Sequence, residues 1–481
     1  MKAGARAARS VAAMSTAISP AALAELRFRL RGDLHEPGSP GYESACELFN
    51  AMIDIRPRLV ARCATPADVV AALAFARDHD LPVSVRAGGH AVTGRALVED
   101  GLVLDVRPMD DIVVDPRARR VRVGGGATWA AVDRATTAHG LATTGGRVST
   151  TGVAGLTTGG GSGWLERKHG LACDNLLAAE LVTADGRVVR ADADENPDLL
   201  WALRGGGGNF GVVTALELAL HPIPERVVAG LAILPASRAR EALECYRDVT
   251  ERAPEELSLA FAAMPAPDDD EIPEHLRGEH CVFIIGMHAG SIADGEAAIA
   301  PIRALKPDLD AFAPTGYADF QCSIDDPPGS RNYWTAESVQ ALDAEVVDIL
   351  VDQIERMPAG EGRAPQIFMA HWGGAVARAT AEDSPLAARD SGYVVHPLLM
   401  WTDPADDEAM MAYGRGIRDA LRAHATGEAY ANFLGDEGED RVRAGYAPGA
   451  YERLAAIKAQ WDPEDRFRAN GHVRPAAAAV A

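Results

Sequence analysis

Residues 85–94 read Val-Arg-Ala-Gly-Gly-His-Ala-Val-Thr-Gly, and this stretch decides how the rest of the chain is interpreted. It follows a short apolar run, residues 81–85, that predicts a β-strand. Three glycines surround a single histidine, His90, directly after that strand. Taken alone, the stretch is equally typical of a surface turn or of a histidine whose ring satisfies local backbone groups. The choice between these interpretations and a functional site depends on the remaining sequence.

Two further glycine clusters accompany the first one. They are residues 143–177, TTGGRVSTTGVAGLTTGGGSGWLERKHGLACDNLL, and residues 203–215, LRGGGGNFGVVTA. Glycine lets main-chain N–H groups approach a ligand without an intervening side chain. Successive N–H groups in turns form concavities that suit anions such as a pyrophosphate. Three clusters, each beside a predicted strand or helix, therefore indicate a dinucleotide stretched across a domain.

Two common nucleotide-binding motifs do not explain these clusters. The sequence contains no GxxxxGK[ST] string, which a P-loop requires. Residues 205–211, GGGGNFG, contain a GxGxxG pattern, but they follow a predicted helix and precede a predicted strand. That order is the reverse of a Rossmann turn.

Composition and periodicity divide the 481 residues into four parts. Residues 1–20 predict a disordered lead, and residues 21–224 alternate strands and helices with glycine-rich turns. Residues 225–428 mix strand-like runs with helices, including one predicted over residues 338–357, which is typical of an α+β sheet covered by helices. Residues 429–481 have the turns and aromatic anchors of a segment that packs back onto another domain.

Charge and cysteine usage exclude several classes of protein. The chain has 47 Lys and Arg against 69 Asp and Glu, a net charge of −22. Nucleic-acid binding requires a basic surface, and so does docking on an anionic membrane. The six cysteines show neither CxxC pairs nor zinc-ligand spacing, so we expect no metal, reduced thiols and a cytoplasmic protein.

Four segments in this order carry a family resemblance: VRAGGHAVTG, GVAGLTTGGGSGWLERKHGLACDNL, NPDLLWALRGGGGNFGVVT and YERLAAIKAQWDPEDRFRAN. Together they resemble the berberine bridge enzyme-like branch of the FAD-linked oxidases, in the vanillyl-alcohol oxidase superfamily, over about residues 55–475. The resemblance implies a two-lobed FAD-binding domain of that superfamily over residues 21–224 and a substrate domain with an antiparallel sheet over residues 225–428. Residues 429–481 would return to the FAD-binding domain.

The resemblance also implies how FAD is held. In the family, the histidine of the R-x-G-G-H motif, here His90, is bonded to the 8α carbon of the flavin. The family's second link, to a cysteine, is absent because Val148 occupies that position. The implied cofactor-binding residues are Arg86, Ala87, Gly88, Gly89, His90, Gly94, Val148, Ser149, Thr150, Thr151, Gly152, Val153, Gly155, Leu156, Gly159, Gly160, Gly161, Trp164, Asn175, Gly206, Gly207, Asn209, Phe210, Gly211, Val212, Val213, Asn432 and Asn470.

Two residues are candidates for the base that takes a substrate proton. His396 lies in GYVVHPLLMWTDP, where the family places polar residues facing the flavin. Burying an ionisable group in an apolar strand is costly, so its presence there indicates a functional role. Tyr430 lies in EAYANF, which resembles the family's Y-x-N-[FY] segment. Simple packing is the alternative for both side chains. A further tyrosine of some relatives is replaced here by Ser162.

The resemblance implies an oxidase that takes hydride from the CH–OH group of a sugar or natural-product alcohol and passes the electrons to O2. A dehydrogenase or an oxidative-cyclising enzyme of the same family is an alternative. So is a flavin-binding protein without turnover. Thr151 occupies the position at which relatives gate oxygen by side-chain bulk, and it is not a bulky leucine, which favours oxygen access. Monomer and homodimer are both compatible with these features.

Overall fold

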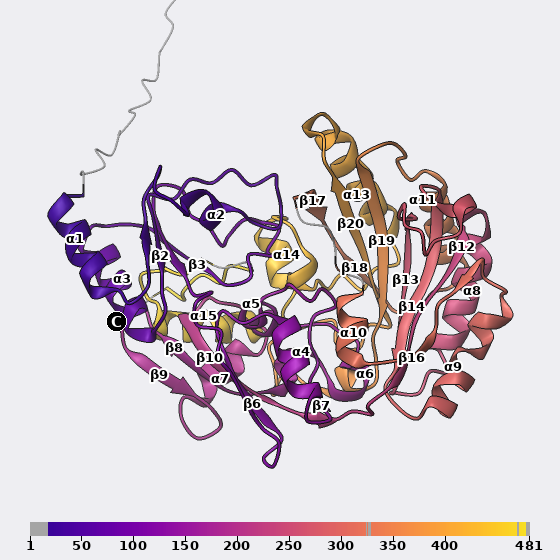
Figure 1. The fold of residues 1–481 in the computed structure, drawn as a ribbon, viewed down its shortest axis with the longest axis horizontal. Coiled ribbons are helices and arrows are strands. Elements are labelled where there is room, and N and C mark those ends of the chain that lie inside the picture. The colour runs from indigo at the N-terminus through magenta and orange to yellow at the C-terminus, as the bar shows by residue number, and fades with distance from the viewer. Residues whose placement is uncertain (1–17, 324, 326–328, 469–470, 478–481) are drawn as a thin grey trace, which may run out of the picture.

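The computed structural model describes residues 18–323, 325, 329–468 and 471–477. They form two lobes (Figure 1). We call them the glycine-rich lobe, which holds the three glycine clusters, and the sheet lobe, which holds the largest β-sheet. Most of the predicted lead, residues 1–17, lies outside the described residues, and α1 (Pro20–Arg29) begins directly after Ser19, whose hydroxyl accepts from Ala22 N.

Two sheets build the glycine-rich lobe within the described residues. One is four-stranded, in the order β1-β2-β4-β3, and the other is five-stranded, in the order β5-β6-β10-β8-β9. The first consists of β1 (Leu34–His35), β2 (Leu59–Arg62), β4 (Leu102–Asp105) and β3 (Val83–Arg86). The second consists of β5 (Ile112–Asp115), β6 (Arg120–Gly124), β10 (Val212–Ala219), β8 (Leu176–Val182) and β9 (Val188–Ala191). A short pair, β7 (Leu141–Ala142) and β11 (His221–Pro222), leads into the sheet lobe.

Local sequence signals position the first glycine cluster. Helix α3 (Pro66–Asp78) begins after Thr65, whose hydroxyl accepts from Asp68 N, and Pro66 takes the first helical position. Strands β2 and β3 both run parallel to β4. The loop after β3 therefore begins at the carboxyl edge of a parallel sheet, where α/β proteins commonly bind ligands. The helices of this lobe are α1, α2 (Tyr42–Cys46), α3, α4 (Trp129–Thr137), α5 (Val153–Thr158), α6 (Glu166–His169), α7 (Pro197–Leu203) and α15 (Ala450–Trp461).

The sheet lobe is built on an antiparallel sheet of nine strands within the described residues. Its strands are β12 (Val227–Pro235), β13 (Leu257–Pro265), β14 (His280–His288), β15 (Leu309–Asp310), β16 (Ala313–Thr315), β17 (Arg331–Trp334), β18 (Glu337–Val339), β19 (Arg363–His371) and β20 (Tyr393–Trp401). Its helices are α8 (Ala239–Thr250), α9 (Ile292–Ala304), α10 (Tyr317–Cys322), α11 (Ala344–Glu355), α12 (Ala375–Arg378) and α13 (Asp407–Leu421), and α14 (Glu439–Ala444) lies between the two lobes (Figure 1).

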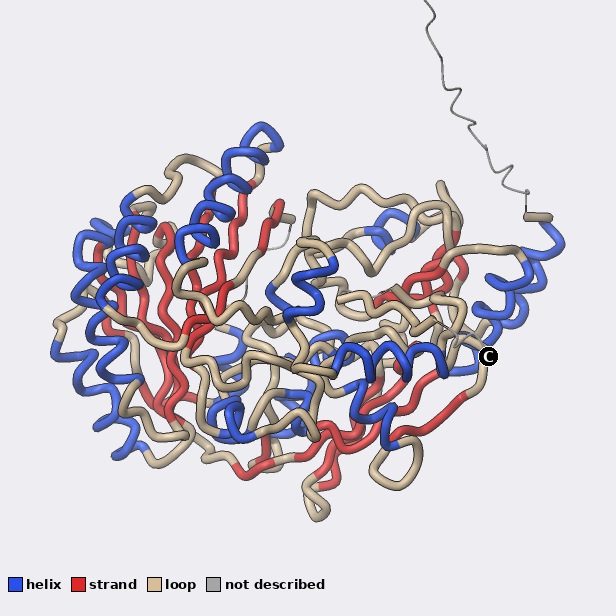
Figure 2. The backbone as a smooth tube through the Cα atoms, turned by 180° about the vertical axis from the view of Figure 1, so that it is seen from behind, coloured by secondary structure: helices blue, strands red, loops and turns tan. Residues whose placement is uncertain are grey.

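One face of this sheet is covered by helices and the other faces the glycine-rich lobe. Helices α8, α9, α11 and α13 lie on the outer face, as both views show (Figures 1 and 2). Residues such as Leu243, Ile299 and Leu350 pack there against the strands in one apolar cluster. This arrangement confirms the expected α+β class with a helix-covered antiparallel sheet.

The helix predicted over residues 338–357 is shorter than expected. Helix α11 spans Ala344–Glu355, and the first residues of the predicted segment belong to β18 instead. Val339 pairs with Tyr393 of β20, so a long-range ladder replaces local helical hydrogen bonds.

The C-terminal segment completes the core of the glycine-rich lobe. Tyr451, Leu454 and Trp461 of α15 belong to the same apolar cluster as Trp129 and Phe210. The fully buried Lys458 Nζ donates to Asn209 O at 2.8 Å, to Phe467 O at 2.6 Å and to Asp462 Oδ2 at 2.6 Å. A buried ammonium with these three acceptors ties the third glycine cluster to the last helix.

Candidate active site

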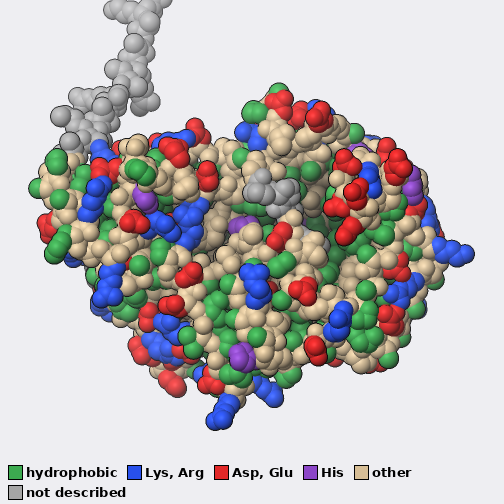
Figure 3. Space-filling model, viewed as in Figure 1, with side chains coloured by type: hydrophobic (Ala, Val, Ile, Leu, Met, Phe, Trp, Pro, Cys, Tyr) green, Lys and Arg blue, Asp and Glu red, His purple; other side chains and the backbone are tan. Residues whose placement is uncertain are grey.

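A cavity of about 860 Å³ lies between the two lobes. The surface is hollowed between them, and Asp and Glu side chains are interspersed with Arg and Lys on the visible face (Figure 3). Loops of the glycine-rich lobe form one side of the cavity, which we call the backbone wall. Strands of the large sheet form the other side, which we call the sheet wall.

Half of the expected cofactor residues line this cavity. They are Ala87, Gly88, Gly89, His90, Val148, Thr151, Gly152, Gly155, Leu156, Gly159, Gly207, Gly211, Val213 and Asn432. All three glycine clusters thus meet on the backbone wall, as expected for a dinucleotide site. The sheet wall is formed by Leu231, Ala262, Met264, Phe283, Ile285, Trp334, Ala364, Gln366, Phe368, His396, Leu398 and Met400.

The first two glycine clusters touch through their main chains. A Cβ added at Gly88 would lie 2.3 Å from Gly152 N, and one added at Gly152 would lie 2.5 Å from Gly88 N. Neither position can carry a side chain without moving the other loop. By contrast, a Cβ at Gly155 would meet no atom within 4 Å. Gly155 therefore leaves open space on the cavity side of α5.

His90 lies on the backbone wall between an aromatic ring and two hydroxyl groups. Its imidazole stacks on Phe49, with ring centroids 4.6 Å apart. Thr150 Oγ1 lies 3.1 Å from Nε2, and Thr151 Oγ1 lies 3.5 Å from Nδ1. Burial lowers the pKa of His90 to about 4. The imidazole is therefore neutral near pH 7, the form in which its nitrogen lone pair is nucleophilic.

The loop that precedes α5 is held by a residue of the sheet lobe. Ser149 donates its N–H and its hydroxyl to the Asp325 carboxylate, at 2.6 and 2.5 Å. Val148 lines the cavity beside this anchor and offers no nucleophile.

His396 lies on the sheet wall, in the centre of β20. Its Nδ1 is 2.9 Å from Thr335 O, so Nδ1 carries the hydrogen and donates to that carbonyl. Its Nε2 is buried and has no partner in the described part of the chain. The ring stacks on Phe433 at 4.3 Å and meets the edge of Trp334 at 5.2 Å. Burial lowers the pKa of His396 to about 4, which leaves a neutral imidazole with an unused acceptor nitrogen.

Tyr430 lies behind the glycine run of residues 159–161 and not among the residues that line the cavity. Its hydroxyl oxygen accepts from Gly161 N at 2.7 Å and from Ser162 N at 3.0 Å, and burial raises its pKa. At Gly160, whose φ is +126°, an added Cβ would lie 2.8 Å from the Tyr430 ring. The space beside Gly160 is thus filled by tyrosine, although the family resemblance implied that Gly160 binds the cofactor.

Asn432 joins this arrangement from the same C-terminal segment. Its Nδ2 donates to Leu156 O at 3.1 Å and lies 3.3 Å from the Tyr430 hydroxyl. A Cβ at Gly159 would overlap Asn432 Oδ1 at 2.1 Å. Tyr430 and Asn432 therefore set the path of the glycine run, and Asn432 also reaches the cavity.

Several predicted cofactor residues lie away from the cavity lining and form hydrogen bonds within the protein. The Arg86 guanidinium donates to the carbonyls of Ala45 and Glu47. Asn175 Nδ2 donates to His169 O and Leu171 O, and Asn209 Nδ2 donates to Gly206 O. The remaining ones off the lining are Gly94, Ser149, Thr150, Val153, Gly160, Gly161, Trp164, Gly206, Phe210 and Val212. Asn470 lies outside the described residues.

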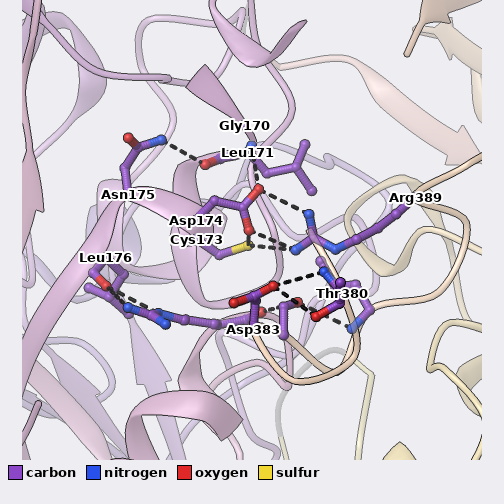
Figure 4. Close-up of polar contacts among 12 residues, drawn as sticks. Gly170, Leu171, Cys173, Asp174, Asn175, Leu176, Thr380, Asp383 and Arg389 are labelled. Atoms are coloured by element: carbon purple, nitrogen blue, oxygen red, sulfur yellow. Dashed lines mark hydrogen bonds and ion pairs between the residues drawn. The ribbon is translucent and has the colours of Figure 1, made fainter. Parts of the chain in front are cut away.

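A buried ion pair fixes the segment that follows the second glycine cluster. Arg389 donates to both Asp174 oxygens, at 2.9 and 2.7 Å, and its Nη2 lies 3.8 Å from Cys173 Sγ (Figure 4). Burial raises the pKa of the Cys173 thiol. Cys173 is therefore an unreactive buried thiol, and the ion pair joins the two lobes. All six cysteines, each within the described residues, are free thiols.

The structure also brings residues to the site that sequence reasoning did not single out. Phe49 stacks on His90, Asp325 anchors Ser149, Thr335 orients His396, and Gln366 lies on the sheet wall. Of these, only Gln366 gives a sequence signal, as a polar residue directly before the apolar run of residues 367–370.

The residues present suit a large flat cofactor. Glycine main chain lines the backbone wall, space is open beside Gly155, and a neutral histidine faces the cavity. Fold and site together define a two-lobed FAD-linked oxidoreductase.

Comparison with known proteins agrees with this class. The chain matches the family model "FAD binding domain" over residues 57–192 and "Berberine and berberine like" over residues 429–474. It is 30% identical to (R)-6-hydroxynicotine oxidase of Paenarthrobacter nicotinovorans over 458 residues, 93% of this chain and 97% of that one. The protein belongs to the berberine bridge enzyme-like family of FAD-linked oxidoreductases.

Solved structures share the fold. The crystal structure of 6-hydroxy-D-nicotine oxidase from Arthrobacter nicotinovorans superposes with a TM-score of 0.85 at 29% identity, covering 93% of this chain and 98% of that one. A xylooligosaccharide oxidase from Myceliophthora thermophila superposes with a TM-score of 0.81 at 22% identity, covering 95% and 100% of the two chains. No helix in the described residues is long and apolar enough to cross a membrane.

Proposed function

We propose that the protein is an FAD-dependent oxidase that takes hydride from the CH–OH carbon of a small alcohol and transfers the electrons to O2, giving H2O2. Bound FAD supplies the hydride acceptor and the site of oxygen reduction. The protein's own contribution is to hold the cofactor, orient the alcohol and accept its hydroxyl proton.

The observation that carries this proposal is the state of His396. Donation from Nδ1 to Thr335 O fixes the ring and its tautomer, so Nε2 is the acceptor. That nitrogen has no partner among the described residues, although it lies in a ring that lines the cavity. His396 Nε2 is thus suited to take the hydroxyl proton while hydride leaves the adjacent carbon.

His90 is proposed as the covalent attachment point for the flavin. The neutral imidazole faces the cavity, and the flat Phe49 ring restricts its rotation. Val148 at the position of the family's second link leaves a single bond. This assignment rests on the family pattern together with the position of His90.

Tyr430 is proposed to position the glycine run and not to act as the base. Its hydroxyl already accepts two main-chain hydrogen bonds, and deprotonating it would place a phenolate in a fully buried site. Asn432 would hold the flavin edge beside the same run.

An oxidase is proposed over a dehydrogenase on two grounds. A full-length relative carries the name of an oxidase. Thr151, at the gating position, lines the cavity with a small side chain.

The test is anaerobic mixing of the yellow protein with a panel of primary and secondary alcohols. At least one alcohol should bleach the flavin, and air should restore the colour with one H2O2 per alcohol. Acid precipitation should leave flavin on the wild-type polypeptide and release it from His90→Ala. Bleaching that air does not reverse would favour a dehydrogenase, and no bleaching by any alcohol would contradict the proposed reaction.

A further inference from the structure

The sheet wall carries few polar groups. Among the strand residues of the sheet wall, those with a polar head are Trp334, Gln366 and His396. The Trp334 indole N–H donates to Asn332 Oδ1 at 3.3 Å, and His396 is assigned above to the reacting hydroxyl. This leaves Gln366 as the polar side chain of the sheet wall that has no assigned hydrogen-bond partner.

The Gln366 amide is half-buried and forms no hydrogen bond with any group in the described ranges of the chain. A carboxamide offers two donor hydrogens and one acceptor oxygen. Surrounded by Leu398 and Met400 on an apolar wall, such a group gains from a ligand that both donates and accepts.

Strand register places Gln366 close to His396 on one surface. Phe368 pairs with His396 and Gln366 pairs with Leu398, and all four side chains line the cavity. Gln366 is thus a diagonal neighbour of His396, a relation that separates side chains by about 7–8 Å in an antiparallel sheet. A single six-membered ring with substituents at opposite ends spans a gap of this kind.

We propose that Gln366 determines substrate specificity by binding a neutral group that both donates and accepts a hydrogen bond, such as an amide or lactam. This group lies at the far end of an apolar ring whose near end carries the CH–OH carbon at His396. The inference rests on the proposed function for the identity of the reacting carbon. It favours such a ring over a sugar at this wall, because sugar hydroxyls that lie against its apolar side chains would be buried without partners.

Three probes of the holoenzyme test the inference: 4-(hydroxymethyl)benzamide, 4-isopropylbenzyl alcohol, which replaces the amide with an apolar group of the same shape, and xylobiose. Binding is read as the Kd from perturbation of the flavin absorbance, recorded anaerobically and separately from any bleaching. The wild type should bind the benzamide about tenfold more tightly than the isopropyl compound, the effect of about one well-made hydrogen bond. Xylobiose should bind most weakly.

Gln366→Leu should reverse the preference between the two aromatic alcohols while retaining its flavin. Gln460→Leu, an exposed position on α15, is the matched control and should keep the wild-type preference. Tighter binding of xylobiose than of the benzamide, an unchanged preference in Gln366→Leu, or no binding of the benzamide up to its solubility limit would overturn the inference. Preferential benzamide binding without bleaching would instead count against the proposed reaction and leave the Gln366 assignment standing.

Discussion

The two walls of the cavity are built in different ways. The backbone wall is made of loops in which glycine main chains touch each other, as at Gly88 and Gly152. The sheet wall is made of side chains that project from regular strands at alternating positions. Where the loops of the first wall touch, at Gly88 and Gly152, no added atom fits without moving a main chain. The second can change its chemistry one residue at a time while the strands stay in register.

Each wall carries one histidine, and the two histidines differ in their hydrogen-bond partners. Burial lowers the pKa of His90 and of His396 to about 4, so both rings are neutral near pH 7. His90 has threonine hydroxyls beside both ring nitrogens, whereas His396 has one nitrogen bound to a carbonyl and the other unpartnered. The same ionisation state therefore serves attachment on one wall and proton transfer on the other in our proposal.

The largest expected effect comes from removing the sheet-wall histidine. His396→Ala should slow anaerobic flavin bleaching by about 10²–10⁴-fold, the usual contribution of a general base, and should keep its flavin. Stopped-flow absorbance measures the rate, and the wild-type rate should fall only as pH drops toward about 4. His139→Ala, at an exposed turn, should match the wild type. A wild-type rate in His396→Ala would place the base elsewhere.

A side chain on the backbone wall should act on folding and on cofactor loading together. In Gly88→Val, the new Cβ would overlap the main chain of Gly152, at a cost of about 3 kcal/mol or more in unfolding free energy. Urea unfolding and the ratio of flavin to protein absorbance measure the two effects. Gly416→Val, where an added Cβ meets nothing within 4 Å, should retain its flavin. Full flavin content in Gly88→Val would show that the two loops can separate.

Tyr430→Phe tests whether the tyrosine supports the backbone wall or takes part in the reaction. Loss of the hydroxyl leaves the N–H groups of Gly161 and Ser162 without their acceptor, at a cost of about 1–3 kcal/mol. The bleaching rate per bound flavin should stay near the wild-type value. Tyr413→Phe, which loses one hydrogen bond to Gln353 O far from the cavity, is the stability control. Normal stability with a much slower rate would instead make Tyr430 a catalytic residue.

The smallest effect is a dependence of stability on pH. The folded-state pKa of His396 is about 4, below the unfolded value of about 6.5, so the unfolded chain binds the proton first as pH falls. Stability contributed by the neutral ring is complete above about pH 6.5 and is lost progressively toward pH 4. At about pH 5.5 this loss is about 1.4 kcal/mol.

Urea unfolding at about pH 7.5 and pH 5.5 should therefore show a smaller difference between the two pH values in His396→Ala than in the wild type. His139→Ala should keep the wild-type difference. An equal difference in all three proteins would mean that the His396 ring is charged or solvated in the folded state.

The backbone wall could be predicted from sequence because its signals are local. Gly88, Gly89 and His90 follow a predicted strand within ten residues, and this local pattern predicts a glycine-rich turn. The structure places that loop at the cavity. The positions of these residues in the sequence motifs did not show which of them line the cavity and which support its walls. Arg86, Asn175 and Asn209 lie in the same motifs but bond to the protein's own main chain.

The partners of these residues could not be predicted, because they come from distant segments. Phe49 lies 41 positions before His90, and Asp325 lies 176 positions after Ser149. Local sequence periodicity does not predict such pairs, because they form only when distant segments pack together in the folded chain. The same reason explains why the helix predicted over residues 338–357 is shorter in the structure. Its first residues form β18, which pairs with the distant strand β20, and local propensity does not predict that pairing.

Lys458 and α15 have a consequence for biosynthesis. The Lys458 ammonium binds Asn209 O and Phe467 O, and α15 fills the core that strands β6, β8 and β10 began. A ribosome releases the sheet lobe before it releases this last helix. The core of the glycine-rich lobe therefore stays incomplete until α15 has been synthesised, so we expect the proposed flavin attachment at His90 to follow the synthesis of α15.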